Sequence, residues 1–217
     1  MEGAPVNSSN LRSVGYDPKV LEESGNMQRW PRLLPLVGVL VAAACFGVAA
    51  SLHPGGYDWS RDYFSTLLRG EPGPARIPAI AGVLIFCLSM AVIFERLARS
   101  FGPSSASTAI QIGGIGSMVY TALAVTPLHD LTVTISIAFF VVAVLALLRV
   151  LYERRATGFL VTGIVWLGLL AASATIYYTG HFASALPWAQ RIVFALFAIW
   201  LIALDIRTPH LRLAEKV

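Results

Sequence analysis

The chain has 217 residues, of which 56% are hydrophobic and 13% are charged. A soluble domain carries about 25% charged residues, and the charges here cluster between long apolar runs, so the composition excludes an ordinary soluble globular fold. The formal net charge of +4 does not indicate nucleic-acid binding, because an excess of Lys and Arg in a membrane protein mainly reports loop topology.

The chain begins with a polar arm, residues 1–28, that has no helical apolar face. Its segment VNSSNLRSVGYDPKVLEE resembles the opening strand and turn of the small soluble domain known as KTSC. The resemblance ends where the rest of that domain would continue, so it implies no function. We expect a cytoplasmic arm at 1–28, a transmembrane domain at 29–208 and a cytoplasmic tail at 209–217.

Six apolar runs follow, each long enough to cross about 30 Å of hydrocarbon as a helix. Backbone groups cannot bond to water inside a bilayer, so each run must be helical. The sequence therefore predicts an all-α polytopic membrane protein with a bundle of six transmembrane helices. The runs are 33–52, 77–94, 108–125, 131–148, 159–177 and 186–204.

The 16 Lys and Arg residues are distributed unevenly between the two sides of this bundle. Four of them, Arg61, Arg69, Arg76 and Arg191, fall on one side, and the others fall on the side that holds both termini. The positive-inside rule therefore places both termini in the cytoplasm.

The connection after the first run, HPGGYDWSRDYFSTLLRG (53–70), is unusually rich in polar and aromatic residues. Asp58 reads as a helix N-cap and Gly70 as the residue after a helix end, about three turns later. Trp59, Tyr63 and Phe64 share one apolar face with the two leucines that follow. The pattern predicts a short extracytoplasmic amphipathic helix lying in the membrane interface.

Several titratable or nucleophilic side chains are expected on this outer face. The candidate catalytic residues are His53, Asp58, Ser65, His129, Asp130 and His181. Three histidines with aspartates are residue types that can hold Zn²⁺ and activate water, so His53, His129 and His181 are the candidate metal ligands. Each candidate catalytic residue also has a structural interpretation without chemistry. Asp130, for example, can cap the fourth helix. No cofactor is predicted, and zinc is retained only as the alternative.

A second set of outer-face residues is suited to lipid or partner contact. Its members are Trp59, Tyr63, Trp188, Gln190 and Arg191. Tryptophan and tyrosine favour the membrane interface. Arg191 lies about a turn inside the last helix, where a charge must face the bundle or reach outward, with Asp130, Asp62 or a lipid phosphate as its partner.

Small residues lie within two of the spans: Gly113, Gly114 and Ser117 in the third, and Gly163 and Gly168 in the fifth. Such residues permit close helix approach, either within the bundle or against a membrane-protein partner or second copy. Cys45 and Cys87 lie inside apolar runs and read as small buried hydrophobes. A haem site would need histidines within the spans, and a transporter would favour charges at mid-membrane, so both are weakly supported.

Three stretches, HPGGYDWSRDYFSTLL, TPLHDL and WAQRIVFALFAIWL, resemble motifs of the DUF998 family of uncharacterised six-span bacterial membrane proteins. The resemblance covers about 33–206 and implies a bacterial cytoplasmic (inner) membrane protein, with no activity attached. The sequence favours a non-catalytic accessory, assembly or lipid-interacting subunit of a membrane complex over an enzyme. The alternative is a metal-dependent lipid hydrolase acting at the extracytoplasmic face through the His/Asp/Ser cluster.

Overall fold

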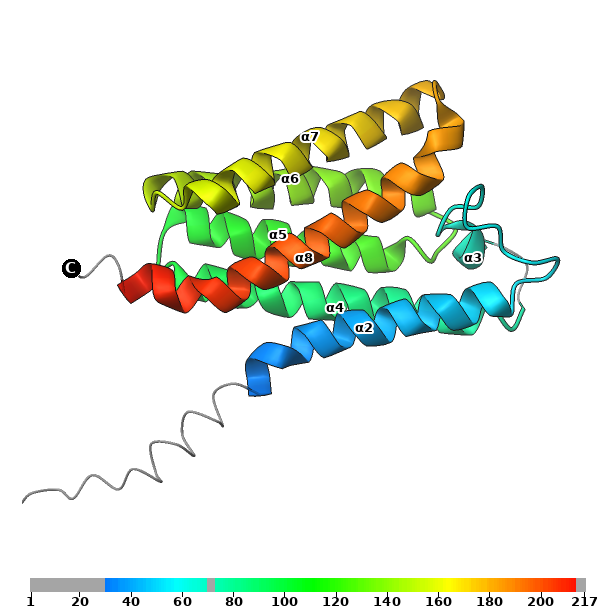
Figure 1. The fold of residues 1–217 in the computed structure, drawn as a ribbon, viewed down its shortest axis with the longest axis horizontal. Helices are drawn as coiled ribbons and strands as arrows, with labels where there is room; N and C mark the ends of the chain where they lie inside the picture. Colours follow the sequence, from blue (N-terminus) through cyan, green and yellow to red (C-terminus); the bar gives the residue numbers. More distant parts are fainter. Residues whose placement is uncertain (1–29, 70–72, 214–217) are drawn as a thin grey trace, which may run out of the picture. The chain divides into compact units, whose positions relative to one another are not determined.

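The protein is seen in a computed structural model that describes residues 30–69 and 73–213, with side chains for 33–69 and 73–208. The chain divides into two compact units, Met1–Leu33 and Leu34–Val217. The predicted arm at 1–28, Gly70 and residues 214–217 lie outside the described residues. Within the described residues the chain is helical and has no strand (Figure 1). The helices are α2 (Trp30–Ser51), α3 (Thr66–Arg69), α4 (Arg76–Ser100), α5 (Ser105–Leu123), α6 (His129–Glu153), α7 (Thr157–Thr179), the 3₁₀ turn η2 (Ala183–Ala185) and α8 (Leu186–Leu213).

The six predicted apolar runs each coincide with one of the long helices. Within the described residues, five of these helices are long and apolar enough to cross a membrane: α2, α4, α6, α7 and α8. The helix α5 does not meet this criterion, because its 19 residues include serines, threonines, glycines and Gln111. The prediction of a helical, membrane-type fold is thus confirmed at the level of five apolar helices. α8 continues to Leu213, so the predicted tail boundary at 209 falls inside a helix.

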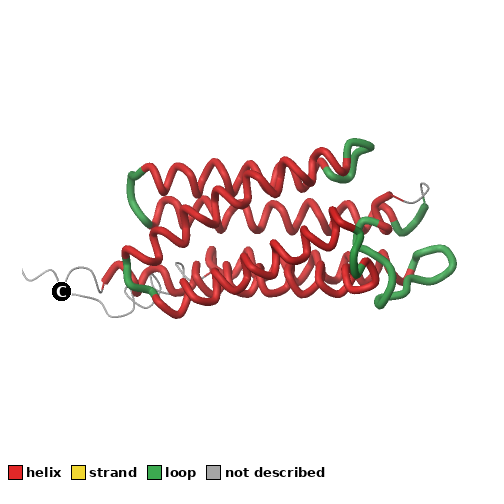
Figure 2. The backbone as a smooth tube through the Cα atoms, turned by 90° about the horizontal axis from the view of Figure 1, so that it is seen from above, coloured by secondary structure: helices red, strands yellow, loops and turns green. Residues whose placement is uncertain are grey.

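The long helices of the second unit run beside one another, and their connections gather at two ends (Figure 2). We call the end holding residues 52–69, 73–75, 124–128 and 180–185 the loop end. The end holding residues 101–104 and 154–156 is the far end. This arrangement brings three connections that are distant in sequence to the same end, as the alternating direction of the helices requires.

An aromatic cluster lies at the centre of the bundle, with one ring each from α4, α6, α7 and α8. The Phe140 ring centroid lies 4.8 Å from that of Phe197 and 5.2 Å from that of Trp166, and Phe94 lies 6.2 Å from both phenylalanines. The indole N–H of Trp166 donates to the Val193 carbonyl at 2.8 Å, which satisfies its one polar atom. These rings fix α7 and α8 against the rest of the bundle.

Small residues allow α5 to pack closely against its neighbours. A Cβ atom on Gly114 would lie 2.2 Å from the Phe94 ring of α4, and one on Gly113 would lie 2.8 Å from the Phe139 carbonyl of α6. Between α5 and α6, the Thr121 and Ser136 hydroxyls are 2.6 Å apart, and Ser136 of α6 also donates to the Ser117 carbonyl of α5 at 2.9 Å. The hydroxyls of Ser117 and Thr121 on α5 are therefore hydrogen-bonded inside the bundle.

Candidate functional site

The connection 52–65 folds back over the loop end instead of forming the predicted three-turn helix. Gly55 and Gly56 adopt positive φ angles of 82° and 85°, which favour glycine and turn the chain after α2. One carboxylate oxygen of Asp58 accepts from the Ser60 amide at 2.8 Å and the Ser60 hydroxyl at 2.6 Å. The Asp58 amide itself donates to the Asp62 carboxylate at 2.8 Å. Asp58 thus caps a tight turn, and only Thr66–Arg69 is helical.

Side chains of α8 explain why the predicted helix is wrong. In a helix the carbonyls of Trp59 and Asp62 would accept from backbone amides one turn later. Here both carbonyls accept instead from the Arg191 guanidinium, at 2.6 Å for Asp62. The Phe64 amide donates to the Gln190 side chain at 3.3 Å, so it too is withdrawn from a helical pattern.

Arg191 is the centre of this arrangement. Its Nη2 also donates to the Tyr57 hydroxyl at 3.0 Å. The guanidinium carbon lies 5.3–5.9 Å from four ring centroids, within the range of cation–π attraction. These rings belong to Tyr57, Trp59, Phe64 and Trp188, and with Arg191 they form what we call the Arg191 cluster. The predicted pairing of Arg191 with an Asp carboxylate is not observed, because the contact to Asp62 is made through its backbone.

The pKa values of two side chains in this connection are shifted. Burial raises the pKa of the Tyr57 hydroxyl, and the hydrogen bond from Arg191 opposes that shift. The hydrogen bonds from the Ser60 hydroxyl and amide lower the pKa of the Asp58 carboxyl. The Tyr57 shift thus follows from burial in the folded loop, and the Asp58 shift follows from hydrogen bonds within its turn.

A second set of contacts joins α3, α6 and α7 at the same end. Arg69 forms an ion pair with Asp130, and the Tyr177 hydroxyl donates to the same Asp130 oxygen at 3.0 Å. The Tyr178 and Thr134 hydroxyls are 3.0 Å apart. Asp130 is the second residue of α6 and not its N-cap, which is Leu128. Its carboxylate still lies in the first turn, where the helix dipole favours a negative charge.

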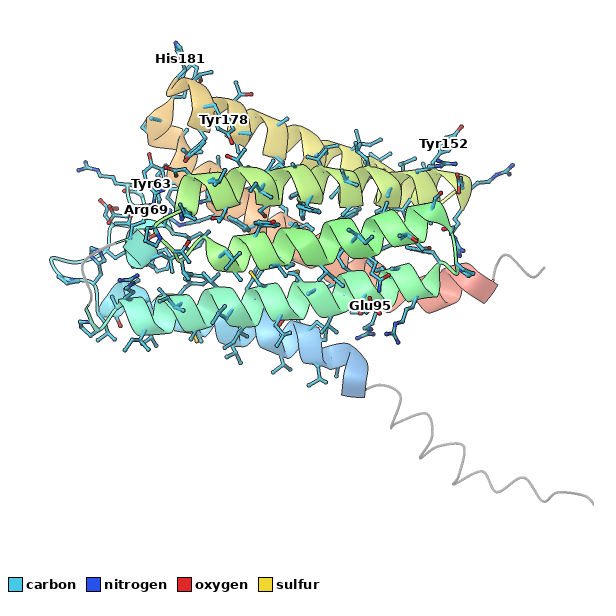
Figure 3. The ribbon with its side chains drawn as sticks, turned by 180° about the vertical axis from the view of Figure 1, so that it is seen from behind. Tyr63, Arg69, Glu95, Tyr152, Tyr178 and His181 are labelled. Atoms are coloured by element: carbon cyan, nitrogen blue, oxygen red, sulfur yellow. The ribbon has the colours of Figure 1, made fainter. Side chains whose placement is uncertain are left out.

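The structure does not bring the three candidate histidines together. The His53 ring packs edge-on against Tyr57 at 5.9 Å, His129 Nδ1 lies 2.6 Å from the Ala124 carbonyl, and His181 is exposed in the α7–α8 turn. Figure 3 shows His181 at the tip of that turn, apart from Arg69. Across residues 30–69 and 73–213, no group of three His, Cys, Asp or Glu residues is arranged to hold a metal ion.

Ser65 is also placed apart from the candidate acid–base groups. Its carbonyl accepts the amides of Leu68 and Arg69, at 3.1 and 2.9 Å, as α3 begins. In the described part of the chain, no hydrogen bond joins its hydroxyl to a histidine or an aspartate. A nucleophile hydrogen-bonded to a base, the arrangement typical of covalent catalysis, is therefore not formed by these residues.

The residues predicted to meet lipid or a partner have mixed placements. Trp59 and Trp188 are 46% and 52% exposed even though they belong to the Arg191 cluster. The Tyr63 hydroxyl donates to the Ala183 carbonyl at 3.4 Å, linking the loop to η2. Gln190 and Arg191 hold the loop, so they act within the chain.

The small residues named from the sequence are also of two kinds, buried and exposed. Gly113, Gly114, Ser117 and Gly163 are buried inside the bundle, and a Cβ on Gly163 would lie 2.6 Å from Leu148 and 2.7 Å from Trp200. Gly168 differs, because a Cβ there would meet nothing within 4 Å. Of the five small residues named from the sequence, Gly168 therefore lies on an open face.

Charged contacts at the far end were not predicted from the sequence. Asp205 of α8 is only 7% exposed and pairs with Arg96 of α4 at 3.1 Å. Glu95 accepts from Arg99 and from Gln111, each at 2.5 Å. An acidic residue directly after the apolar run 186–204 is the signal that could have indicated the first pair. Cys45 and Cys87 are free thiols, and Cys87 is buried.

Comparison with known proteins found no matching protein-family model, no matching curated protein and no matching solved structure. The resemblance to the DUF998 family and to the start of a KTSC domain therefore stays a prediction.

Proposed function

We propose that this chain is a six-span membrane protein of the bacterial cytoplasmic membrane, with both termini in the cytoplasm. We further propose that it acts as a non-catalytic accessory subunit that docks a membrane-spanning helix of another protein on α7. The observation that carries this proposal is the composition and exposure of the outward face of α7.

That face is poorly covered by the chain itself. Only 11% of the most apolar window of α7 is buried, against 44% for α4. Most residues of α7 between 161 and 175 are exposed, and five of them follow one another at alternating intervals of four and three, which places these five along one stripe of the helix. The stripe consists of Val161, Val165, Gly168, Ala172 and Thr175.

The residue types along this stripe favour a helix as the occupant. Gly168 and Ala172 are one turn apart and present only a hydrogen and a methyl group, so a neighbouring backbone can approach closely. In a bilayer, helices associate by such close packing, since lipid tails are as apolar as the side chains. A surface meant only for lipid has no need of small residues at this spacing. We call the five residues the α7 stripe.

The sixth crossing is supported by α5. Its 19 residues correspond to about 28 Å of helix, close to the hydrocarbon thickness of about 30 Å. Its hydroxyls bond within the bundle, so their burial does not leave polar groups unsatisfied. A non-catalytic role is supported by the loop end, where Arg191, Asp130 and Gln190 bind neighbouring elements of the same chain.

Two glycines provide a matched test of the α7 stripe. The wild-type protein, extracted in a mild detergent, is expected to run as a complex larger than the monomer by light scattering and native mass spectrometry. Gly168→Ile should shift it to the monomer. Gly47→Ile should not, because Gly47 on α2 is also exposed and also has nothing within 4 Å of a Cβ. A wild-type monomer would refute the proposal, and a homodimer would identify the partner as a second copy.

The membrane orientation has its own test in whole cells. In a variant without Cys45 and Cys87, a cysteine replacing His181 at the loop end should react with an impermeant maleimide. A cysteine replacing Ser105 at the far end should react only after permeabilisation. The reverse pattern would contradict the assigned orientation.

A further inference from the structure

A groove on the surface between α4 and α5, at the far end, is lined by apolar and charged side chains. Its volume is about 390 Å³, and its lining residues are Ala91, Val92, Glu95, Arg96, Arg99 and Ile115. Figure 3 shows Glu95 at the opposite end of the bundle from Tyr63 and Arg69. The groove is therefore separate from the Arg191 cluster, and none of its lining residues belongs to α7.

The charges in this groove are held in a fixed arrangement. The two Glu95 carboxylate oxygens accept from Arg99 Nε and Gln111 Nε2, each at 2.5 Å. Arg96 reaches the buried Asp205 carboxylate at 3.1 Å, which ties the groove to α8. Glu95 and Arg99 thus place one carboxylate and one guanidinium side by side in the lining of the groove.

The side chains that line the groove change from apolar to charged along α4. Leu88 and Val92 are 69% and 40% exposed and continue the lipid-facing surface of the helix. One turn further, Glu95 and Arg99 are 24% and 78% exposed. An apolar wall followed by charges at the end of a membrane-spanning helix matches the order of a lipid, whose chains give way to a headgroup.

We propose that this groove binds one phospholipid with a zwitterionic headgroup that carries a primary ammonium, of the phosphatidylethanolamine type. The phosphate lies against the Arg99 guanidinium, whose five N–H donors allow it to bind Glu95 and a phosphate together. The ammonium lies against the Glu95 carboxylate, and an acyl chain follows Ala91, Val92 and Ile115. A phosphatidylglycerol headgroup would offer the same phosphate to Arg99 but has no ammonium to meet the Glu95 carboxylate.

The inference rests on the membrane placement proposed above, but not on the α7 stripe. An alkaline carbonate wash of membranes distinguishes failure of the membrane placement from failure of the lipid site. Release of the protein by the wash would refute the membrane placement. A protein that stays in the membrane but retains no lipid would refute only the lipid site.

Native mass spectrometry of the full chain in mild detergent tests the lipid site. Wild-type protein is offered equal amounts of phosphatidylethanolamine, phosphatidylcholine and phosphatidylglycerol of matched chain length. We expect one phosphatidylethanolamine to be retained, in preference to both others. Arg99→Gln should weaken that retention about tenfold, since it removes a charged hydrogen-bond donor. Glu95→Gln should abolish the preference for phosphatidylethanolamine over phosphatidylcholine, because a carboxylate binds the primary ammonium best.

The control variant is Arg149→Gln. Arg149 pairs with Glu153 at 2.9 Å and is 70% exposed, so it is another exposed Arg–Glu pair four residues apart, outside this groove. It should retain lipid as the wild type does. Equal loss in Arg99→Gln and Arg149→Gln, a wild-type preference for phosphatidylglycerol, or no retained lipid would each overturn the proposal.

Discussion

Replacing Arg191 with alanine tests what holds the 52–65 connection in its observed form. The change removes hydrogen bonds to the Trp59 carbonyl, the Asp62 carbonyl and the Tyr57 hydroxyl, all from a charged donor. Such bonds contribute about 1.5–3 kcal/mol each when well shielded. The connection is partly exposed and water replaces some of them, so we discount the sum to about 3 kcal/mol of local stability.

A loss of about 3 kcal/mol corresponds to about a hundredfold faster opening of the connection. Hydrogen exchange followed by mass spectrometry should show this at the amides of Arg61, Asp62 and Phe64, which are bonded in the folded loop. Amides in the middle of α4 should exchange as in the wild type. Arg191→Lys should recover only part of the protection, because one ammonium cannot reach the same acceptors in a fixed plane.

The matched control for this experiment is Arg61→Ala. Arg61 belongs to the same connection, but its side chain is 86% exposed and lies 3.7 Å from Asp58. We expect no measurable change in exchange for that variant. Unchanged exchange in Arg191→Ala would refute the reasoning, because it would mean that the loop keeps its form without Arg191.

Three further results are expected. Gly114→Ala should lower the free energy of unfolding in detergent by about 1–3 kcal/mol, because the new Cβ would lie 2.2 Å from the Phe94 ring; an unchanged melting temperature would contradict the packing. Trp166→Phe should cost about 1 kcal/mol in the same assay through loss of the hydrogen bond to Val193, and no change would mean that this bond is not needed. The raised pKa of Tyr57 means that the folded loop binds this proton more tightly than the unfolded chain, so exchange protection should fall as the pH rises above about 10. Tyr57→Phe should remove that pH dependence, and persistence of the dependence would assign it to another group.

The sequence was sufficient to predict the helices because hydrophobic burial and backbone bonding both act locally along each run. Each of the six predicted runs overlaps one long helix, although 108–125 runs two residues past the end of α5 and α5 is less apolar than the others. The boundaries were less accurate: α4 extends to Ser100, six residues beyond the predicted run.

The loop end could not be predicted in the same way, because its form depends on contacts across more than 120 residues of sequence. The residues 58–69 carry a good local helix pattern, with Asp58 as a cap. Arg191 and Gln190 override that pattern by taking the backbone groups that a helix would use. The same applies to Asp130, whose partner Arg69 could not be chosen over Arg191 from spacing alone.

The central claim is that α7 docks a helix of another membrane protein, and photo-crosslinking in cells tests it most directly. A photoreactive amino acid replaces Gly168 in one variant and Gly47 in the other, since both positions are exposed and open. We predict a covalent adduct to a protein from position 168 and none from position 47. Adducts to lipid alone at 168, or equal protein adducts from both positions, would contradict the account.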